Sequence, residues 1–197
     1  MSSTTSLPCE APCVIDIEAS GFGLGSYPIE VGAVLPDGAA YCSLISPEPD
    51  WQHWEPTAEA VHGITREVLK AHGKPAARVA SELNRCLHAQ TVYTDAWYHD
   101  FQWLARLFDA ADMQPQFVLK DLRQALDEAA LARWDAAKTQ VLDELKLNRH
   151  RASNDARVLQ QTWVRVTAHA AVTSQQNRAK NIIHCSGSQR LVQTEAK

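Results

Sequence analysis

The sequence predicts an α/β fold within one domain. Near the N-terminus, three segments with strand character follow one another through short turns. From about residue 74 onward, segments with helical periodicity alternate with short β-prone runs. A length of 197 residues is enough for one domain to bury its own core. We therefore assign residues 13–171 to the folded domain, residues 1–12 to a flexible N-terminus, and residues 172–197 to a polar tail that is disordered or loosely packed.

The first strand, residues 14–21, carries two acids, Asp16 and Glu18. Successive side chains of a strand point to opposite faces, so these two carboxylates project from the same face, about 6 to 7 Å apart. Buried carboxylates repel each other, and each is pushed toward its neutral form unless a cation lies between them. The pair therefore indicates a divalent metal site. The alternative is a strand whose exposed end happens to carry two acids.

A glycine-rich segment, residues 21–26, follows this strand. Its third glycine falls too early for a dinucleotide-binding motif, and residues 27–35 read as a strand rather than as the helix that such a motif requires. Residues 36–38 then favour a turn into a further strand over residues 40–45. The three strands are predicted to form an antiparallel meander.

The loop at residues 47–56 contains Trp51 and Trp54, which either stack on nucleic-acid bases or pack over the rim of the core. Thr57 is placed to cap a short helix that leads into the segment VHGIT. His62 in this segment precedes a glycine. That position is typical of a structural, hydrogen-bonding histidine, and a catalytic role is the alternative.

The middle of the chain predicts a helix, a short strand and a second helix. Residues 74–90 have apolar side chains at helical spacing, and residues 91–94 are β-prone. A further helix is expected to begin near Asp100, which shares a face with the apolar Leu104 and Leu107. Asp100 therefore points inward, unless it only caps the helix or favours the helix dipole.

The last part of the domain brings another acid and a histidine. Residues 117–119 predict a final strand, Asp121 is a candidate cap for the helix that follows, and residues 135–147 are helical in pattern. Asp155 then lies on the buried side of the last helix, one turn before its apolar stripe. His150 is expected on the loop that leads into this helix, close enough to turn toward the same cavity.

The composition is that of an ordinary soluble globular protein, with 45% hydrophobic residues and a net charge of -4. Five scattered cysteines, without a C-x-x-C pair or a Cys/His zinc spacing, predict free thiols in a reducing compartment. No segment resembles a signal peptide or a membrane span, so we expect a cytoplasmic protein with no membrane partner. A mildly acidic chain is poorly suited to gripping long nucleic acid, so any such ligand would be held over a short stretch.

The motifs around these acids resemble those of the DEDDh 3′-to-5′ exonucleases. VIDIEASG is similar to the first family motif, which supplies Asp16 and Glu18, and TDAWYHDFQWL is similar to the second, which supplies Asp100. HRASNDA resembles the third motif, which supplies Asp155 and, five residues earlier, His150. VHGIT resembles a further family segment near the active site.

The resemblance spans about residues 12–171 and departs from the family in the second motif. There Asp95 replaces the usual asparagine and one extra residue precedes Asp100, so Asp95 is a competing candidate for the second-motif acid. We favour Asp100 because the helical stripe that the family shows after its acid follows this residue. The resemblance implies an RNase H-like fold, a mixed five-stranded sheet of three antiparallel strands plus two further strands, with helices on both faces.

By resemblance, the expected activity is metal-dependent hydrolysis of the terminal phosphodiester at a 3′ end of single-stranded DNA or RNA, releasing nucleoside 5′-monophosphates. His150 would act as the general base, and two Mg²⁺ or Mn²⁺ ions would be held by Asp16, Glu18, Asp155 and Asp100. Substrate contacts are expected in the loop after the first strand and at nearby aromatic side chains. The candidates are Ala19, Ser20, Gly21, Phe22, Leu24, Trp54, His62 and Trp97.

Two other functions are compatible with the sequence. The low basic charge favours a metal phosphodiesterase that acts on very short oligonucleotides, and a non-catalytic nucleic-acid or protein-binding module could keep the same fold. The choice between DNA and RNA depends on loop geometry around the 2′-hydroxyl. The oligomeric state is open at this point, a dimer included.

Overall fold

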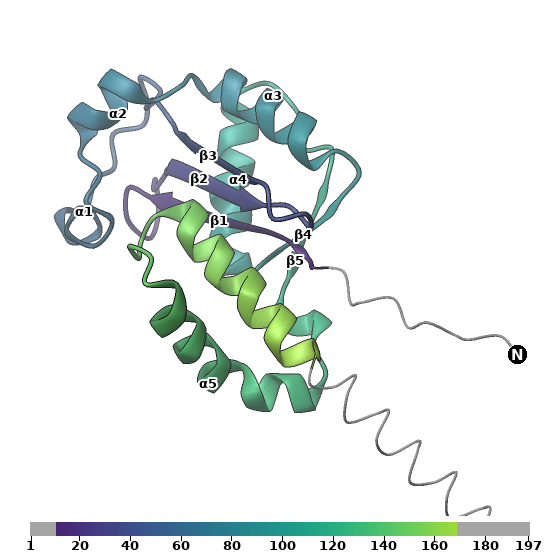
Figure 1. The fold of residues 1–197 in the computed structure, drawn as a ribbon. Coiled ribbons are helices and arrows are strands. Elements are labelled where there is room, and N and C mark those ends of the chain that lie inside the picture. The colour runs from purple at the N-terminus through teal and green to yellow at the C-terminus, as the bar shows by residue number, and fades with distance from the viewer. Residues whose placement is uncertain (1–10, 169–197) are drawn as a thin grey trace, which may run out of the picture.

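The computed structural model describes residues 11–168, which form one mixed sheet with helices packed around it (Figure 1). The sheet has five strands in the order β3-β2-β1-β4-β5, with β1 at its centre. The C-terminal tail expected at residues 172–197 and most of the N-terminal segment expected at 1–12 lie outside the described residues. The strands are β1 (Cys13–Ala19), β2 (Pro28–Val34), β3 (Ala40–Leu44), β4 (Thr91–Thr94) and β5 (Val118–Asp121).

The pairing of these strands confirms the predicted α/β class and the antiparallel meander. β1 pairs antiparallel with β2, and β2 pairs antiparallel with β3. β4 then runs parallel to β1, and β5 runs parallel to β4. The carboxyl ends of β1, β4 and β5 consequently meet at one edge of the sheet, where ligands commonly bind in open α/β sheets.

The helices depart from the predicted boundaries in three places. α4 begins at Trp97, three residues before the predicted start, so Asp100 lies inside the first turn and is not its cap. The Asp121 carboxylate accepts the Arg123 N–H at the start of a 3₁₀ turn, so the helix predicted after it is only this short turn, whereas α5 begins at Glu128, capped by Asp127, seven residues before the predicted start at 135. A short helix after Thr65 was not predicted. The helices are α1 (Pro56–His62), α2 (Arg66–His72), α3 (Ala76–Leu87), α4 (Trp97–Ala110), the 3₁₀ turn η1 (Arg123–Ala125), α5 (Glu128–Leu145) and a final helix, 152–168.

Two hydrophobic clusters cover the two faces of the sheet. Ile15 and Ile17 of β1 pack in one cluster with apolar side chains of α3 and α4. Val14, on the opposite face, packs in the second cluster with side chains of α5 and the final helix, such as Trp134 and Leu159. Figure 1 shows this division, with α5 and the final helix on one side of the sheet and α3 and α4 on the other. The predicted alternation of β1 side chains is therefore confirmed.

Gly32 of β2 brings the final helix against the sheet. A Cβ atom at this position would lie 2.1 Å from the backbone nitrogen of Ser153, a distance that no real contact shows. Gly32 pairs directly with Asp16 of β1. The missing side chain therefore lets the start of the final helix approach the strand that carries the two acids.

Three of the five cysteines are described, and all three are free thiols: Cys13, Cys42 and Cys86. This agrees with the predicted absence of disulfides as far as the described residues reach. No helix within residues 11–168 is long and apolar enough to span a membrane.

Candidate active site

A cavity of about 450 Å³ opens near the carboxyl end of β1. Its walls come from β1, α1, α4 and the segment that precedes the final helix, so parts of the chain that are distant in sequence meet there. The four acids singled out from the sequence all line this cavity, together with the histidine: Asp16, Glu18, Asp100, Asp155 and His150.

Ionisation of the two acids of β1, Asp16 and Glu18, is unfavourable. Burial, together with the neighbouring carboxylates of Asp100 and Glu18, raises the pKa of Asp16 well above its ordinary value. Burial, with the Asp155 carboxylate as the next cause, raises the pKa of Glu18 to about 7. Both side chains therefore resist ionisation at neutral pH unless a cation compensates them.

Asp100 enters the cavity from the first turn of α4. Its carboxylate accepts a hydrogen bond from the Thr94 hydroxyl at the end of β4. Burial raises the pKa of Asp100 to about 7, although the Thr94 bond works in the opposite direction. The competing acid, Asp95, instead forms an ion pair with Lys138 of α5 at 3.0 Å and lies outside the lining of this cavity.

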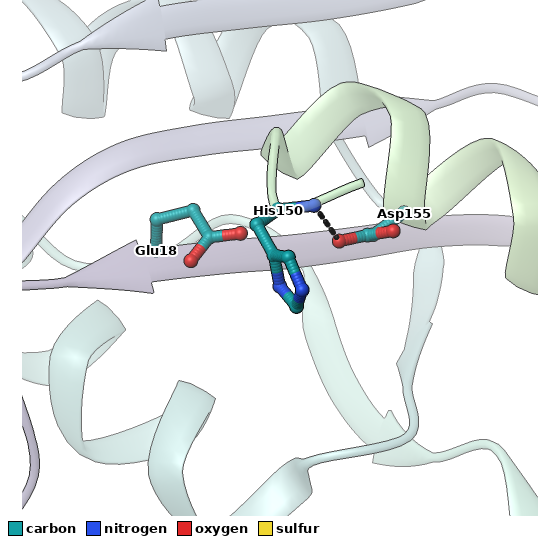
Figure 2. Close-up of side chains that lie close together, drawn as sticks. All are labelled: Glu18, His150 and Asp155. Carbon is teal, nitrogen blue, oxygen red and sulfur yellow. Dashed lines mark hydrogen bonds between the residues drawn. The ribbon is translucent and has the colours of Figure 1, made fainter. Parts of the chain in front are cut away.

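His150 and Asp155 are held together at the start of the final helix. The His150 backbone adopts a left-handed conformation, with φ of 60°, and its N–H donates to the Asp155 carboxylate at 2.9 Å. Figure 2 shows Glu18 and Asp155 on either side of His150. Ligand atoms of these three side chains all lie within 4.8 Å of one another. The prediction that His150 lies on the loop leading into the helix is confirmed.

The donor set fits a divalent metal ion. Five carboxylates line the cavity, those of Asp16, Glu18, Asp100, Asp155 and also Glu55, and the lining includes no lysine or arginine that could neutralise them. Carboxylate oxygens are the ligands that Mg²⁺ and Mn²⁺ prefer, and an imidazole nearby is also compatible with Mn²⁺. A bound cation would offset the repulsion that raises the pKa of Asp16 and Glu18.

The sequence did not reveal an ion pair that stabilises the segment leading into the final helix. Glu30 of β2 is fully buried, and its carboxylate is paired with the Arg151 guanidinium, with the shortest contact at 2.5 Å. The same carboxylate accepts the backbone N–H of Ala152 at 2.9 Å. Arg151 directly follows His150 in the chain, so Glu30 holds the backbone on which the histidine is carried. The sequence signal for this ion pair was a single acid, Glu30, within the apolar stretch PIEVGAV.

Among the predicted substrate contacts, Ala19, Gly21, Phe22 and His62 line the cavity. His62 is buried, and its Nδ1 accepts the Ile64 backbone N–H at 3.0 Å, so the neutral ring carries its proton on Nε2. Burial also lowers the pKa of His62. Phe22 is 61% exposed at the cavity rim, with its ring edge against His99, another lining residue that the sequence did not reveal.

The other predicted substrate contacts lie outside the cavity lining. The Ser20 hydroxyl is buried and accepts the Tyr27 backbone N–H, while Leu24 is fully exposed. Trp54 donates its indole N–H to Glu59, and Trp97 faces a different hollow. The remaining tryptophan of the first loop, Trp51, is buried and stacked on Tyr27, so the interpretation of Trp51 as a base-stacking residue is wrong and its packing in the core is confirmed.

Solved structures of exonuclease I share this fold. E. coli exonuclease I in complex with a dA16 oligonucleotide matches with a TM-score of 0.55 and 16% identity, over 74% of this chain and 38% of that one. The zinc-bound form of the E. coli exonuclease I–ssDNA complex matches with a TM-score of 0.53 and 15% identity, over 88% and 42%. The metal-free form matches with a TM-score of 0.54 and 16% identity, over 88% and 41%.

This chain therefore spans about two fifths of the length of exonuclease I. At such low identities the likeness shows a shared fold alone, and the mixed five-stranded sheet agrees with the RNase H-like sheet implied by the motifs. The sequence matches no protein-family model and no curated protein.

Proposed function

We propose that this protein is a metal-dependent 3′-to-5′ exonuclease of the DEDDh type, which removes nucleotides from the 3′ end of single-stranded nucleic acid and releases nucleoside 5′-monophosphates. The observation that carries the proposal is that the four acids expected from the motifs and His150 all line a single cavity. The likeness to exonuclease I, which has been solved in complex with single-stranded oligonucleotides, supports the same class of activity.

Two divalent ions, Mg²⁺ or Mn²⁺, fit the acidic side chains. Asp16, Glu18 and Asp155 would hold one ion, and Asp16 and Asp100 would serve the second. Ions at such a site stabilise negative charge on the transferring phosphoryl group and make water a stronger acid. The raised pKa of the Asp16 and Glu18 carboxyls supports this assignment, because it reflects burial and then repulsion by neighbouring carboxylates, both of which a bound cation would offset.

His150 is the proposed general base, which takes the proton from the attacking water. Histidine suits this task because its charge changes near neutral pH, whereas the surrounding acids are engaged as ligands. Its left-handed backbone and the bond from its N–H to Asp155 orient the ring toward the acids. Because a ring nitrogen also lies within reach of Glu18 and Asp155, direct metal ligation is the rival role.

The His150→Ala variant separates these two roles. As the base, His150 can be removed with little change in Mn²⁺ affinity, measured by calorimetry, while turnover falls by about 100-fold or more. A variant that loses Mn²⁺ binding in parallel with turnover would make His150 a ligand instead. Unchanged turnover would exclude both roles.

The cavity rim accounts for a preference for unpaired 3′ ends. Phe22 presents an exposed ring beside the cavity, where it can stack on the terminal base without regard to sequence. His62 also lines the cavity, but its Nε2 is buried and its Nδ1 accepts the Ile64 N–H, so the ring shapes the cavity wall. The Phe22 contact supports binding of single strands with little base preference.

The decisive experiment incubates 5′-labelled single-stranded DNA and RNA with Mg²⁺ or Mn²⁺, using the wild type and the Asp16→Asn variant. We expect a ladder that shortens one nucleotide at a time, that disappears in the variant, and that does not form when the 3′ hydroxyl is blocked. Asp109→Asn, an exposed acid at the far end of α4, is the matched control and should cleave like the wild type. Cleavage that persists in Asp16→Asn would overturn the proposal, and no cleavage in any form would favour a non-catalytic module.

A phosphodiesterase specific for very short oligonucleotides is the second candidate, because the net charge of -4 disfavours a long phosphate-binding surface. A length series of substrates decides between the two functions. A strand-degrading exonuclease should hydrolyse a decanucleotide at least as efficiently as a dinucleotide. A strong preference for the dinucleotide would favour the second candidate.

A further inference from the structure

A second hollow, of about 650 Å³, lies beside the candidate active site and has no role in the function proposed above. It is formed by β4, β5, the 3₁₀ turn η1 and the first residue of α4. The residues on which its chemistry depends are Tyr93, Trp97, Lys120 and Gln124. It therefore combines aromatic faces with a cation and an amide, the groups that nucleic-acid subsites use.

The first turn of α4 separates this hollow from the catalytic cavity. Ala96, His99 and Asp100 line the cavity, whereas Trp97 lines the hollow. Because β1, β4 and β5 run parallel, both depressions open at the same edge of the sheet. A single-stranded nucleic acid whose 3′ end occupied the cavity would need to cross only this turn of α4 to reach the hollow.

Exposed aromatic rings gather on that turn. Among the large side chains exposed within residues 11–168, the aromatic ones are Phe22, Trp97, Tyr98 and Phe101, three of them on the first five residues of α4. Phe22 and Tyr98 both contact the His99 ring, with centroids 5.1 and 5.4 Å away, and Trp97 stacks on Phe101 at 5.3 Å. One group of rings therefore lies at the cavity rim, and the Trp97–Phe101 pair lies on the side of the turn that lines the hollow.

The hollow also offers a positive charge that forms no ion pair. The Lys120 side chain is exposed, and its ammonium group makes no ion pair or hydrogen bond with any described residue. The Asp121 carboxylate also lines the hollow and keeps its negative charge, but its oxygens accept the Arg123 backbone N–H at 2.9 Å and the Gln124 amide at 3.3 Å and do not pair with Lys120. The ammonium group is therefore available to a phosphate, which fits a nucleic-acid strand better than an apolar protein segment.

We propose that this hollow is a second nucleotide-binding subsite, which holds a nucleotide upstream of the 3′ end of a single strand. Trp97 stacks on the base, Lys120 contacts a backbone phosphate, and Tyr98 and His99 support the nucleotides between the two depressions. This inference rests on the proposed exonuclease function for the direction of the strand. It explains how a chain with net charge -4 could hold more than the terminal nucleotide.

The test measures binding of fluorescein-labelled oligothymidylates without added metal, by fluorescence anisotropy, to wild type, Trp97→Ala and Lys120→Gln. Stacking of one base on an aromatic side chain corresponds to a loss of about 5- to 150-fold in affinity when the ring is removed. We expect such a loss for Trp97→Ala with a decanucleotide and a clearly smaller loss with a dinucleotide, which places few groups beyond the cavity. Lys120→Gln should weaken decanucleotide binding and reduce its salt dependence.

Lys70→Gln, which removes an exposed lysine of α2, is the matched control and should bind both lengths like the wild type. Unchanged decanucleotide binding by Trp97→Ala, or an equal loss at both lengths, would overturn the subsite. Hydrolysis is assayed separately with Mn²⁺. A wild type that binds the decanucleotide through Trp97 but cleaves nothing would refute the exonuclease and leave the subsite standing.

Discussion

The neighbouring strands β1 and β2 each carry a glutamate at paired positions, and the two side chains lie in different electrostatic environments. Glu18 of β1 and Glu30 of β2 are directly paired in the ladder. Glu30 is fully buried and neutralised by the Arg151 guanidinium, whereas Glu18 lines the cavity among other acids and its pKa is raised to about 7. A paired acid fixes the backbone around it, and an unpaired acid is available to a cation.

A second pair of positions on β1 and β2, Asp16 and Gly32, shows the same difference between the two strands. Asp16 of β1 lines the cavity, and its partner on β2 is Gly32, whose missing side chain makes room for the final helix. β2 therefore contributes a close approach and an ion pair, and both act on the segment that carries His150 and Asp155. β1 supplies two of the proposed metal ligands, and β2 determines where the segment that carries His150 and Asp155 lies.

The largest expected difference is in activity. Glu18→Gln should lower kcat/KM on a labelled single strand by about 1,000-fold or more, because it removes a proposed ligand of the metal ion at the reacting phosphate. Glu30→Gln should lower it by only about 10- to 100-fold, as is usual for a residue that orients another. Equal losses in the two variants would contradict the division between the strands.

Gly32→Ala tests the close approach. The added Cβ would clash with the Ser153 nitrogen, so the final helix must move, at a cost of about 1 to 3 kcal/mol in the free energy of unfolding and with a large loss of activity. Urea unfolding and the nuclease assay measure both effects. Ala33→Gly, at the next position of β2, weakens the strand without adding atoms and should stay active. A fully stable and active Gly32→Ala would show that the helix does not depend on this contact.

The Glu30–Arg151 pair has a natural control in a second bidentate pair, Glu144–Arg165, on the outside of the molecule. Arg151→Met leaves the buried Glu30 without its cation, so kcat should fall about 10-fold or more and Tm should drop. Arg165→Met should change the free energy of unfolding less than Arg151→Met does and leave kcat unaltered. Arg151→Lys should recover part of the lost kcat, which a merely destabilised variant would not do.

The smallest expected effect concerns the metal-free protein. A carboxyl whose pKa is raised on folding stabilises the fold while it is protonated, and this stabilisation is lost as the pH rises through the folded-state pKa. Glu18 and Asp100, both raised to about 7, should therefore make Tm in EDTA fall between about pH 4.5 and pH 7. Glu18→Gln should flatten this slope and raise Tm at pH 7.5 by on the order of 5 °C. Added Mn²⁺ should raise the Tm of the wild type more than that of the variant, and a Tm that rises with pH in EDTA would contradict the assignment.

Regular periodicity in the sequence made the main elements predictable. The alternation in β1 placed Asp16 and Glu18 on the face opposite Ile15 and Ile17, and the two clusters confirm it. Boundaries that depend on capping were less predictable, because α4 begins at Trp97 after the Thr94 hydroxyl accepts the Ala96 N–H. The environment of Trp51 was also not predictable, since an indole packs equally well against a protein core or a nucleic-acid base.

The sequence by itself determined which residues could serve as ligands, because strand and helix periods orient neighbouring side chains through local backbone geometry. Only the tertiary structure decided that Glu30 supports His150, because the carboxylate and its arginine partner are 121 residues apart. It also decided between Asp95 and Asp100 as cavity residues, since Lys138 of a distant helix pairs with Asp95. Contacts of this kind depend on how elements pack across the sheet, which no short stretch of sequence encodes.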